Sequence, residues 1–137
     1  MSTHARIRKS GLLRGALAAL AFSALAGCAP SYGSIDFDAV STPPVSVTVR
    51  SFLIDMPAGI AVVVRVKPIS DNANDYDASY NVDLFSQDRD VLTVHRRNSR
   101  REFVLVGVNP GETCLEVEID GRPEECIDVE ITEPEGI

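Results

Sequence analysis

Beyond Pro44, apolar residues alternate with polar residues in short runs. The seven runs are Val45 to Val49, Ile60 to Val66, Tyr80 to Leu84, Val91 to Val94, Phe103 to Val108, Leu115 to Ile119 and Ile127 to Ile131. A period of two is that of a strand with one buried face, and clusters of Pro, Gly, Asn and Asp separate the runs. Seven strands in about 90 residues predict an all-β fold, a single antiparallel β-sandwich.

The second half of the chain carries a motif that agrees with this fold. The segment Val106-Gly107-Val108-Asn109-Pro110-Gly111-Glu112-Thr113, with Asp88 to Val94 before it and Val117 and Asp120-Gly121 after it, resembles the end of a bacterial immunoglobulin-like domain of group 2. The resemblance implies an immunoglobulin-like sandwich over residues 45–133, followed by a tail at 134–137. It also implies an extracellular structural or adhesive module, and it brings no catalytic residues.

The amino-terminal end has the layout of an export signal. Residues 1–27 combine a basic start with an apolar stretch from Gly15 to Ala24 and then small residues. This apolar stretch is about half of the roughly 20 residues that a transmembrane helix needs, so a cleaved signal is favoured over a permanent span.

A lipid attachment motif ends this signal. Leu25-Ala26-Gly27-Cys28 resembles the lipobox of bacterial lipoproteins. The resemblance implies cleavage before Cys28, transfer of a diacylglycerol group to the Cys28 thiol, acylation of the freed amino group with a fatty acid such as palmitate, and anchoring in a membrane. Several acyl chains together give stable attachment. Ala29 stands where an Asp would signal inner-membrane retention, so the resemblance favours the outer membrane. The alternative is an ordinary cleaved signal that contains a cysteine.

Removing the signal makes the chain strongly acidic. The full chain has 13 basic and 20 acidic residues, and residues 1–27 hold four of the basic and none of the acidic ones. The remaining 9 basic and 20 acidic residues give a formal charge of −11. Such a surface repels phosphate backbones, so a nucleic-acid partner is not expected.

Residues 28–44 are rich in Ser, Pro, Gly and Asp, which predicts a flexible tether between anchor and sandwich. The alternative is that Ile35, Phe37 and Val40 belong to an added edge strand.

Two cysteines flank the predicted turn at Asp120-Gly121. If Leu115 to Ile119 and Ile127 to Ile131 turn their odd-numbered residues inward, Cys114 and Cys126 both point outward. A three-residue loop at Ile119 to Gly121 would place the two cysteines directly opposite each other. In an exported protein this arrangement predicts a disulfide.

The sequence contains two other candidate sites, an oxygen-rich loop and a histidine. The oxygen-rich loop Asp71 to Asp77 resembles a calcium ligand set, but Ala73, Tyr76 and Val82 occupy places where an EF-hand needs a ligand, a glycine and a glutamate. A solvated loop with no metal is therefore expected. Catalysis and a cofactor are not expected either, because His95 is the single histidine after the signal and lies beside two arginines.

Four of the nine remaining basic residues are Arg96, Arg97, Arg100 and Arg101. They lie between two predicted strands, so they should form a hairpin tip. Arginine suits phosphates and carboxylates, which makes this tip a candidate anion contact, and a solvated turn is the alternative. The sequence thus predicts a lipid-anchored envelope protein whose sandwich is a binding or structural module for an envelope protein or glycan. The alternative function is a calcium-stabilised adhesive domain.

Overall fold

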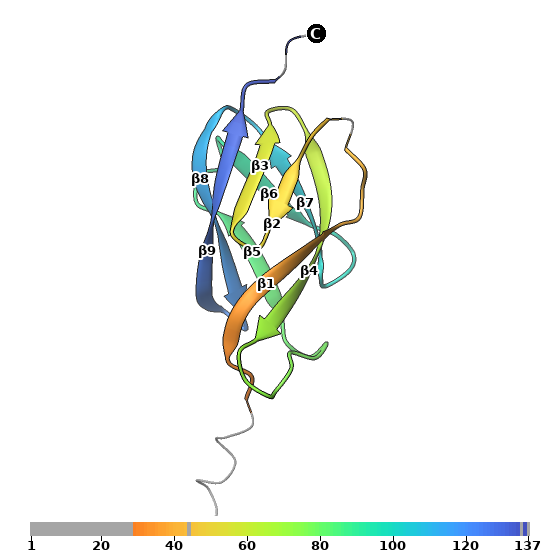
Figure 1. The fold of residues 1–137 in the computed structure, drawn as a ribbon, viewed down its shortest axis with the longest axis vertical. Coiled ribbons are helices and arrows are strands. Elements are labelled where there is room, and N and C mark those ends of the chain that lie inside the picture. Colours follow the sequence, from red (N-terminus) through yellow and green to blue (C-terminus); the bar gives the residue numbers. More distant parts are fainter. Residues whose placement is uncertain (1–28, 44, 135, 137) are drawn as a thin grey trace, which may run out of the picture.

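The computed structural model describes residues 29–43, 45–134 and 136, which form two packed β-sheets (Figure 1). The nine strands are β1 (Tyr32–Ala39), β2 (Thr48–Arg50), β3 (Leu53–Pro57), β4 (Ala61–Ser70), β5 (Val82–Ser86), β6 (Leu92–Arg96), β7 (Glu102–Gly107), β8 (Gly111–Ile119) and β9 (Arg122–Thr132). The predicted all-β sandwich is confirmed, with nine strands in place of seven. In the described residues no helix has the length and apolar character to span a membrane.

The strand order is that of an immunoglobulin-like sandwich. One sheet runs β1-β4-β7-β6 and the other β2-β3-β9-β8-β5. An immunoglobulin sandwich faces a sheet of strands A, B, E and D with a sheet of C, F and G. Strands β1, β4, β7 and β6 take the first four positions, and β5, β8 and β9 take the other three. The pairing of β3 with β9 is parallel, so the sandwich is antiparallel except at this one pair among the described strands.

The predicted tether is wrong over its central part, because residues 32–39 form β1. This strand pairs with β4 from Tyr32 opposite Ser70 to Ala39 opposite Val64, and Ile35 is completely buried. The edge-strand alternative is therefore confirmed for Ile35 and Phe37, whereas Val40 lies beyond the strand and is exposed. The sandwich begins at Tyr32 and not at Val45. Cys28 and Pro44, the two ends of the predicted tether, lie outside the described residues.

Strand β3 was not predicted either, since it falls between two of the predicted runs. The run from Val45 to Val49 contributes only the short β2, which forms a hairpin with β3. Ile54 and Met56 on β3 are completely buried and pair through the backbone with β9.

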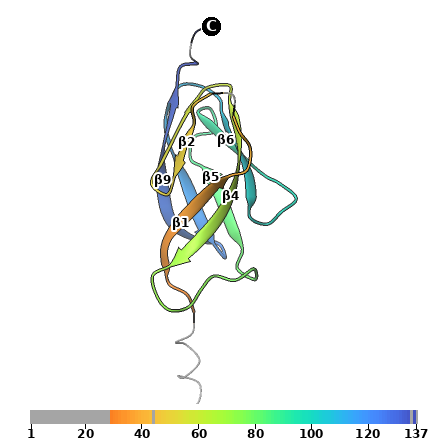
Figure 2. The same ribbon diagram turned by 45° about the vertical axis from the view of Figure 1, so that its right-hand side comes forward.

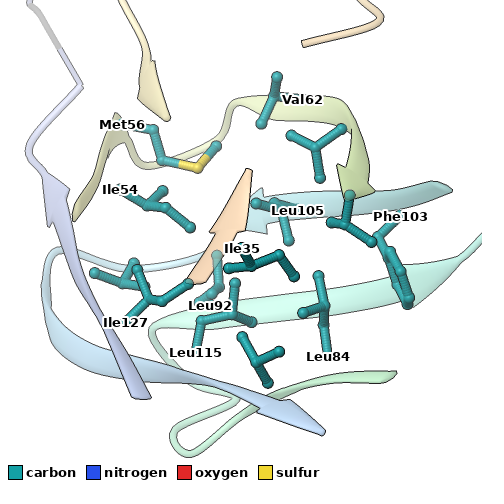
Figure 3. Packing of buried hydrophobic residues seen from close by; sticks show 14 of the residues in the cluster. Ile35, Ile54, Met56, Val62, Leu84, Leu92, Phe103, Leu105, Leu115 and Ile127 are labelled. Carbon is teal, nitrogen blue, oxygen red and sulfur yellow. The ribbon is translucent and has the colours of Figure 1, made fainter. Parts of the chain in front are cut away.

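The core lies between the two sheets, where both contribute inward-facing apolar side chains (Figure 3). The buried residues are Ile35, Ile54, Met56, Val62, Val64, Val66, Val82, Leu84, Val91, Leu92, Phe103, Leu105, Leu115, Val117, Ile119, Ile127, Val129 and Ile131. The predicted inward face of odd-numbered residues on β8 and β9 is confirmed.

Two glycines of the segment Val106 to Thr113 have clear structural reasons. A Cβ on Gly107 would lie 2.8 Å from the carbonyl oxygen of Pro57, at the end of β3 in the opposite sheet. Gly111 has a φ of 155°, a value that side chains rarely allow, and its Cβ would lie 3.1 Å from Val91. Both positions therefore need glycine for backbone placement.

The two sheets are also joined by a polar contact near the start of β1. The Tyr32 hydroxyl donates a 2.5 Å hydrogen bond to the Glu125 carboxylate on β9. Burial, together with the bond to Glu125, raises the pKa of Tyr32 well above its usual range. The phenol therefore stays protonated and keeps its role as donor.

Candidate functional site

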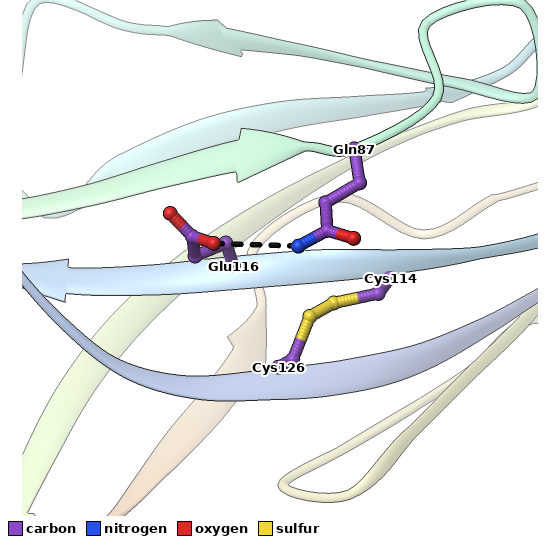
Figure 4. The surroundings of a disulfide bond; sticks show 4 residues. All are labelled: Gln87, Cys114, Glu116 and Cys126. Atoms are coloured by element: carbon purple, nitrogen blue, oxygen red, sulfur yellow. Dashed lines mark hydrogen bonds between the residues drawn. A yellow bond between two sulfur atoms is a disulfide. The ribbon is translucent and has the colours of Figure 1, made fainter.

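The predicted disulfide between Cys114 and Cys126 is confirmed (Figure 4). The two Cα atoms are 5.6 Å apart, which suits a disulfide. Both cysteines lie on the outer face of the β2-β3-β9-β8-β5 sheet, with Cys126 exposed and Cys114 half-buried.

The predicted register of this hairpin is wrong. The turn has two residues, Asp120 and Gly121, which both have positive φ values of 50° and 77°. That conformation matches the right-handed twist of the flanking strands. A bulge between Val117 and Glu118 then shifts the pairing, so Cys126 lies opposite Glu116 and the disulfide joins the strands diagonally.

An open groove of about 710 Å³ lies beside the disulfide on this outer face. Its floor includes Cys114, Thr113 and Leu53. The acidic residues that line it are Asp88, Glu112, Asp128 and Glu130. The side chain of Gln87 donates a 3.3 Å hydrogen bond to Glu116 next to the disulfide (Figure 4).

Like charges face each other directly on this sheet. Asp55 lies opposite Glu130, Glu130 opposite Glu112, and Asp83 opposite Glu118. Each such pair destabilises a sheet by a few tenths of a kcal/mol to about 1 kcal/mol. Partial burial, followed by the neighbouring Glu116 carboxylate, raises the pKa of Glu118.

The predicted basic hairpin is present and joins β6 to β7, where His95 pairs with Val104 and Arg96 with Phe103. The connection projects from the side of the sandwich (Figures 1 and 2). His95 is exposed at the end of β6.

Arg96 is held by bonds within the molecule. Its guanidinium donates to the carbonyl oxygens of Val82 and Arg100, pairs with the Asp83 carboxylate, and lies over the Phe103 ring at 4.9 Å from the ring centre. Val82 and Asp83 belong to β5 of the opposite sheet, so Arg96 connects the two sheets at one edge of the sandwich.

The other three arginines differ in their surroundings. Arg101 donates to the carbonyl oxygens of Asp77 and Tyr80 and so holds the loop between β4 and β5. Arg97 forms a 3.4 Å ion pair with Glu102 and is half exposed. Arg100 is exposed. The structure therefore gives Arg96 and Arg101 structural roles, and the predicted anion contact of all four arginines stays a prediction.

Arg101 also lines a hollow of about 290 Å³ that sequence reasoning missed. The hollow, here called the β4 hollow, lies between the end of β4 and the loop that follows it. Its lining residues are Asp38, Arg65, Val66, Lys67, Pro68, Tyr76, Asp77, Ala78 and Arg101. Two of its three cations, Arg65 and Lys67, come from β4, whose outward positions are remote in sequence from the arginine hairpin. The sequence signal was the alternation of β4, which places both residues on its outer face.

The Asp71 to Asp77 loop uses several of its oxygens to bind its own chain. The Asn72 side chain accepts a hydrogen bond from the Asn74 amide, and Asp77 accepts hydrogen bonds from the amide and hydroxyl of Ser79. These bonds lower the pKa of Asp77. Within the residues that the structure describes, no group of three or more His, Cys, Asp or Glu side chains is arranged to hold a metal ion.

No protein-family model matches the chain, and no curated protein matches its sequence. Among solved structures, the chain is similar to the crystal structure of domains 4 and 5 of the S-layer protein SbsC. The TM-score is 0.46 and the sequence identity is 18%, over 66% of this chain and 54% of the other. The chain thus spans about half the length of that structure.

Proposed function

We propose that this chain is an envelope lipoprotein anchored through lipid on Cys28, in the outer membrane, and that its sandwich is a non-catalytic binding or structural module. The observation that carries the proposal is the place of Leu25-Ala26-Gly27-Cys28 directly before the first strand, which begins at Tyr32. Four residues at about 3.3 to 3.6 Å each would keep the sandwich within roughly 14 Å of its anchor. The module would therefore work close to the lipid surface.

The disulfide supports an envelope location. A bond between Cys114 and exposed Cys126 persists in an oxidising compartment such as the periplasm or the cell surface. A partner reached from this position would be another envelope protein or a glycan.

Replacement of Cys28 tests the proposal. The full chain would be expressed in a Gram-negative host, and the cells would be extracted with a detergent that separates into two phases. We expect the protein to enter the detergent phase and the Cys28→Ser protein to remain in the aqueous phase. Mass spectrometry of the amino-terminal peptide should find acyl groups on Cys28.

The chain offers a matched control. The double variant Cys114→Ser and Cys126→Ser also loses cysteines but keeps the lipid motif, so it should still enter the detergent phase. Detergent partition of the Cys28→Ser protein equal to that of the unchanged protein would contradict lipid anchoring.

A further inference from the structure

The disulfide between Cys114 and Cys126 lies on a face of the sandwich where thiol reagents can reach it. Cys126 is exposed and Cys114 is half-buried. Both side chains point away from the core, since the next residues along the chain, Leu115 and Ile127, are buried. The bond also borders the open groove of about 710 Å³. Burial therefore does not protect the bond, so its reactivity toward thiols depends on the charges around it.

Two carboxylates flank this bond in the register of the hairpin. Glu116 lies opposite Cys126 and two residues along β8 from Cys114. Asp128 lies opposite Cys114 and two residues along β9 from Cys126. The disulfide thus joins one diagonal of a square of four outward-facing residues, and the two carboxylates occupy the other corners. Neighbouring strands lie about 5 Å apart and alternate residues of a strand about 7 Å apart, so each acidic residue is a near neighbour of both cysteines.

The wider surroundings of the bond are acidic as well. The groove beside it is lined by four acidic residues, Asp88, Glu112, Asp128 and Glu130, and no basic residue of the described ranges lines it. Neither Glu116 nor Asp128 belongs to an ion pair in the part of the chain that the structure describes. Both carboxylates therefore keep their charge toward anything that approaches the sulfur atoms.

The basic residues of this region lie farther from the bond. Arg50 shares a row with Asp128 but is two strands away, because β3 lies between them. Arg122 is four residues along β9 from Cys126, which is about 13 Å. Arg89 follows Asp88 in the sequence and is not part of the groove lining. The charge nearest to the disulfide is thus negative.

Opening of a disulfide by thiols proceeds through an anionic nucleophile. A thiolate attacks the sulfur of Cys126, forms a mixed disulfide with it and expels the Cys114 thiolate, which takes a proton from water. A second thiolate attacks the reagent's sulfur in the mixed disulfide, releases the Cys126 thiolate and forms the oxidised reagent. Two thiols are thereby oxidised and one protein disulfide is reduced. Because like charges repel, the carboxylates oppose both the approach of a thiolate and the departure of another.

We propose that the carboxylates beside this bond select the thiols that can open it: anionic thiols are repelled, cationic thiols are admitted, and attack takes place at exposed Cys126. The selection does not depend on lipid at Cys28, so it goes beyond the function proposed above. A redox partner that forms or opens the bond would carry basic residues beside its own reactive cysteine, placed to meet Glu116 and Asp128. Small anionic thiols such as glutathione would leave the exposed bond intact.

Exchange with three related thiols tests the proposal. Cysteamine, 2-mercaptoethanol and 2-mercaptoethanesulfonate share one carbon skeleton and end in a cationic, a neutral and an anionic group. The Cys28→Ser protein is used because its remaining cysteines are Cys114 and Cys126. Initial rates of disulfide opening would be followed by alkylation and mass spectrometry. Each rate is expressed per thiolate and divided by the rate of the same thiol with a small neutral disulfide.

The expected selectivity follows from the two nearest carboxylates. A unit charge about 8 Å from a carboxylate in water changes the encounter rate about twofold at about 0.01 M salt. The cationic and anionic reagents differ by two unit charges and meet two carboxylates, so the cationic thiol should react about 15-fold faster. At about 1 M salt, where charges are screened beyond about 3 Å, the ratio should approach one.

The deciding variant is Glu116→Gln with Asp128→Asn, which nearly keeps the size of both side chains and removes both charges. Its ratio of cationic to anionic rates should be at least about fourfold lower. The matched control is Asp38→Asn with Asp75→Asn, which removes the same charge from exposed residues on β1 and in the loop between β4 and β5. The control should keep its ratio within about twofold. A ratio between reagents on one protein cancels any change in how often the hairpin opens, so it reports charge and not stability.

Three results would overturn the proposal. These are equal rates per thiolate for the cationic and anionic reagents, an unchanged ratio in the Glu116 and Asp128 variant, and an equal drop in the control, which would assign the effect to net charge. Peptide mapping of the first mixed disulfide tests the point of attack. Adducts on Cys126 are expected, and adducts mainly on Cys114 would contradict attack at the exposed sulfur.

Discussion

The substitution Gly107→Ala should destabilise the sandwich through one backbone contact between its sheets. The added Cβ would lie 2.8 Å from the carbonyl oxygen of Pro57 and 3.3 Å from the Ile131 side chain. The Gly107 amide donates to Ile60 and its carbonyl accepts from Gly59, at 3.0 and 2.8 Å, so the strand cannot move away without loss of these bonds. Overpacking of this kind costs about 1 to 3 kcal/mol.

For a domain of this size, that cost lowers the melting temperature by roughly 4 to 15 °C. Circular dichroism during heating and denaturant titration would measure it. Two other glycines provide controls. A Cβ added at Gly121 would contact no atom within 4 Å, but Gly121 has a φ of 77°. A Cβ added at Gly136 would also contact no atom within 4 Å, and Gly136 has no such positive φ. The expected order of destabilisation is Gly107→Ala, then Gly121→Ala at about 1 kcal/mol, then Gly136→Ala near zero. If the Gly107→Ala and Gly136→Ala proteins have the same melting temperature, the close contact with Pro57 does not destabilise the sandwich and the reasoning is refuted.

Three further sets of substitutions probe the disulfide, the arginine hairpin and the acidic sheet. Replacing Cys114 and Cys126 by Ser should lower the free energy of unfolding by about 3 kcal/mol in denaturant titration, because the bond closes a short loop in the unfolded chain; an unchanged midpoint would contradict this. Arg96→Met should cost about 2 kcal/mol, since it removes charge-assisted bonds to β5, whereas Arg97→Met should cost less than about 0.5 kcal/mol; equal losses would show that the bridge between sheets is unimportant. Glu118→Gln should raise the melting temperature at pH 7, because the folded chain raises the pKa of this carboxyl and so pays a penalty for ionising it. The gain should shrink as the pH falls through the raised pKa of the folded chain, and it should vanish below the ordinary value of 4.5, where the carboxyl is protonated in both states. A gain that is constant with pH would contradict the sign.

Alternation of apolar residues was enough to predict the sandwich, because β4, β5, β7, β8 and β9 bury every second side chain over several residues. It failed for β1, where Ile35 is the one completely buried residue and Ser34, Asp36 and Asp38 give the segment the composition of a linker. It failed for β3 because only Ile54 and Met56 are buried there, between a turn and Pro57. Strands β1 and β3 are therefore defined by the strands they pair with and not by their own apolar pattern.

The candidate sites could likewise be predicted only where the residues are close in sequence. The disulfide pair could be predicted, because both cysteines lie on one hairpin and share its outward parity. The two-residue turn and the register shift between Val117 and Glu118 were not predicted, and together they place Cys126 opposite Glu116. The bonds of Arg96 and Arg101 reach Val82 and Tyr80, residues that come close only after the two sheets pack. The β4 hollow is likewise a product of packing between β4 and a loop.

The parallel pairing of β3 with β9 determines when the domain can fold. Strand β9 lies in the middle of its sheet, between β3 and β8, and it is also the last strand that the structure describes. A chain that leaves the ribosome or threads through a translocation pore from its amino end therefore cannot complete this sheet until Thr132 has emerged. Folding of a sheet that needs such distant segments is also intrinsically slow. The strand order thus delays closure of the sandwich until the whole of β9 is available.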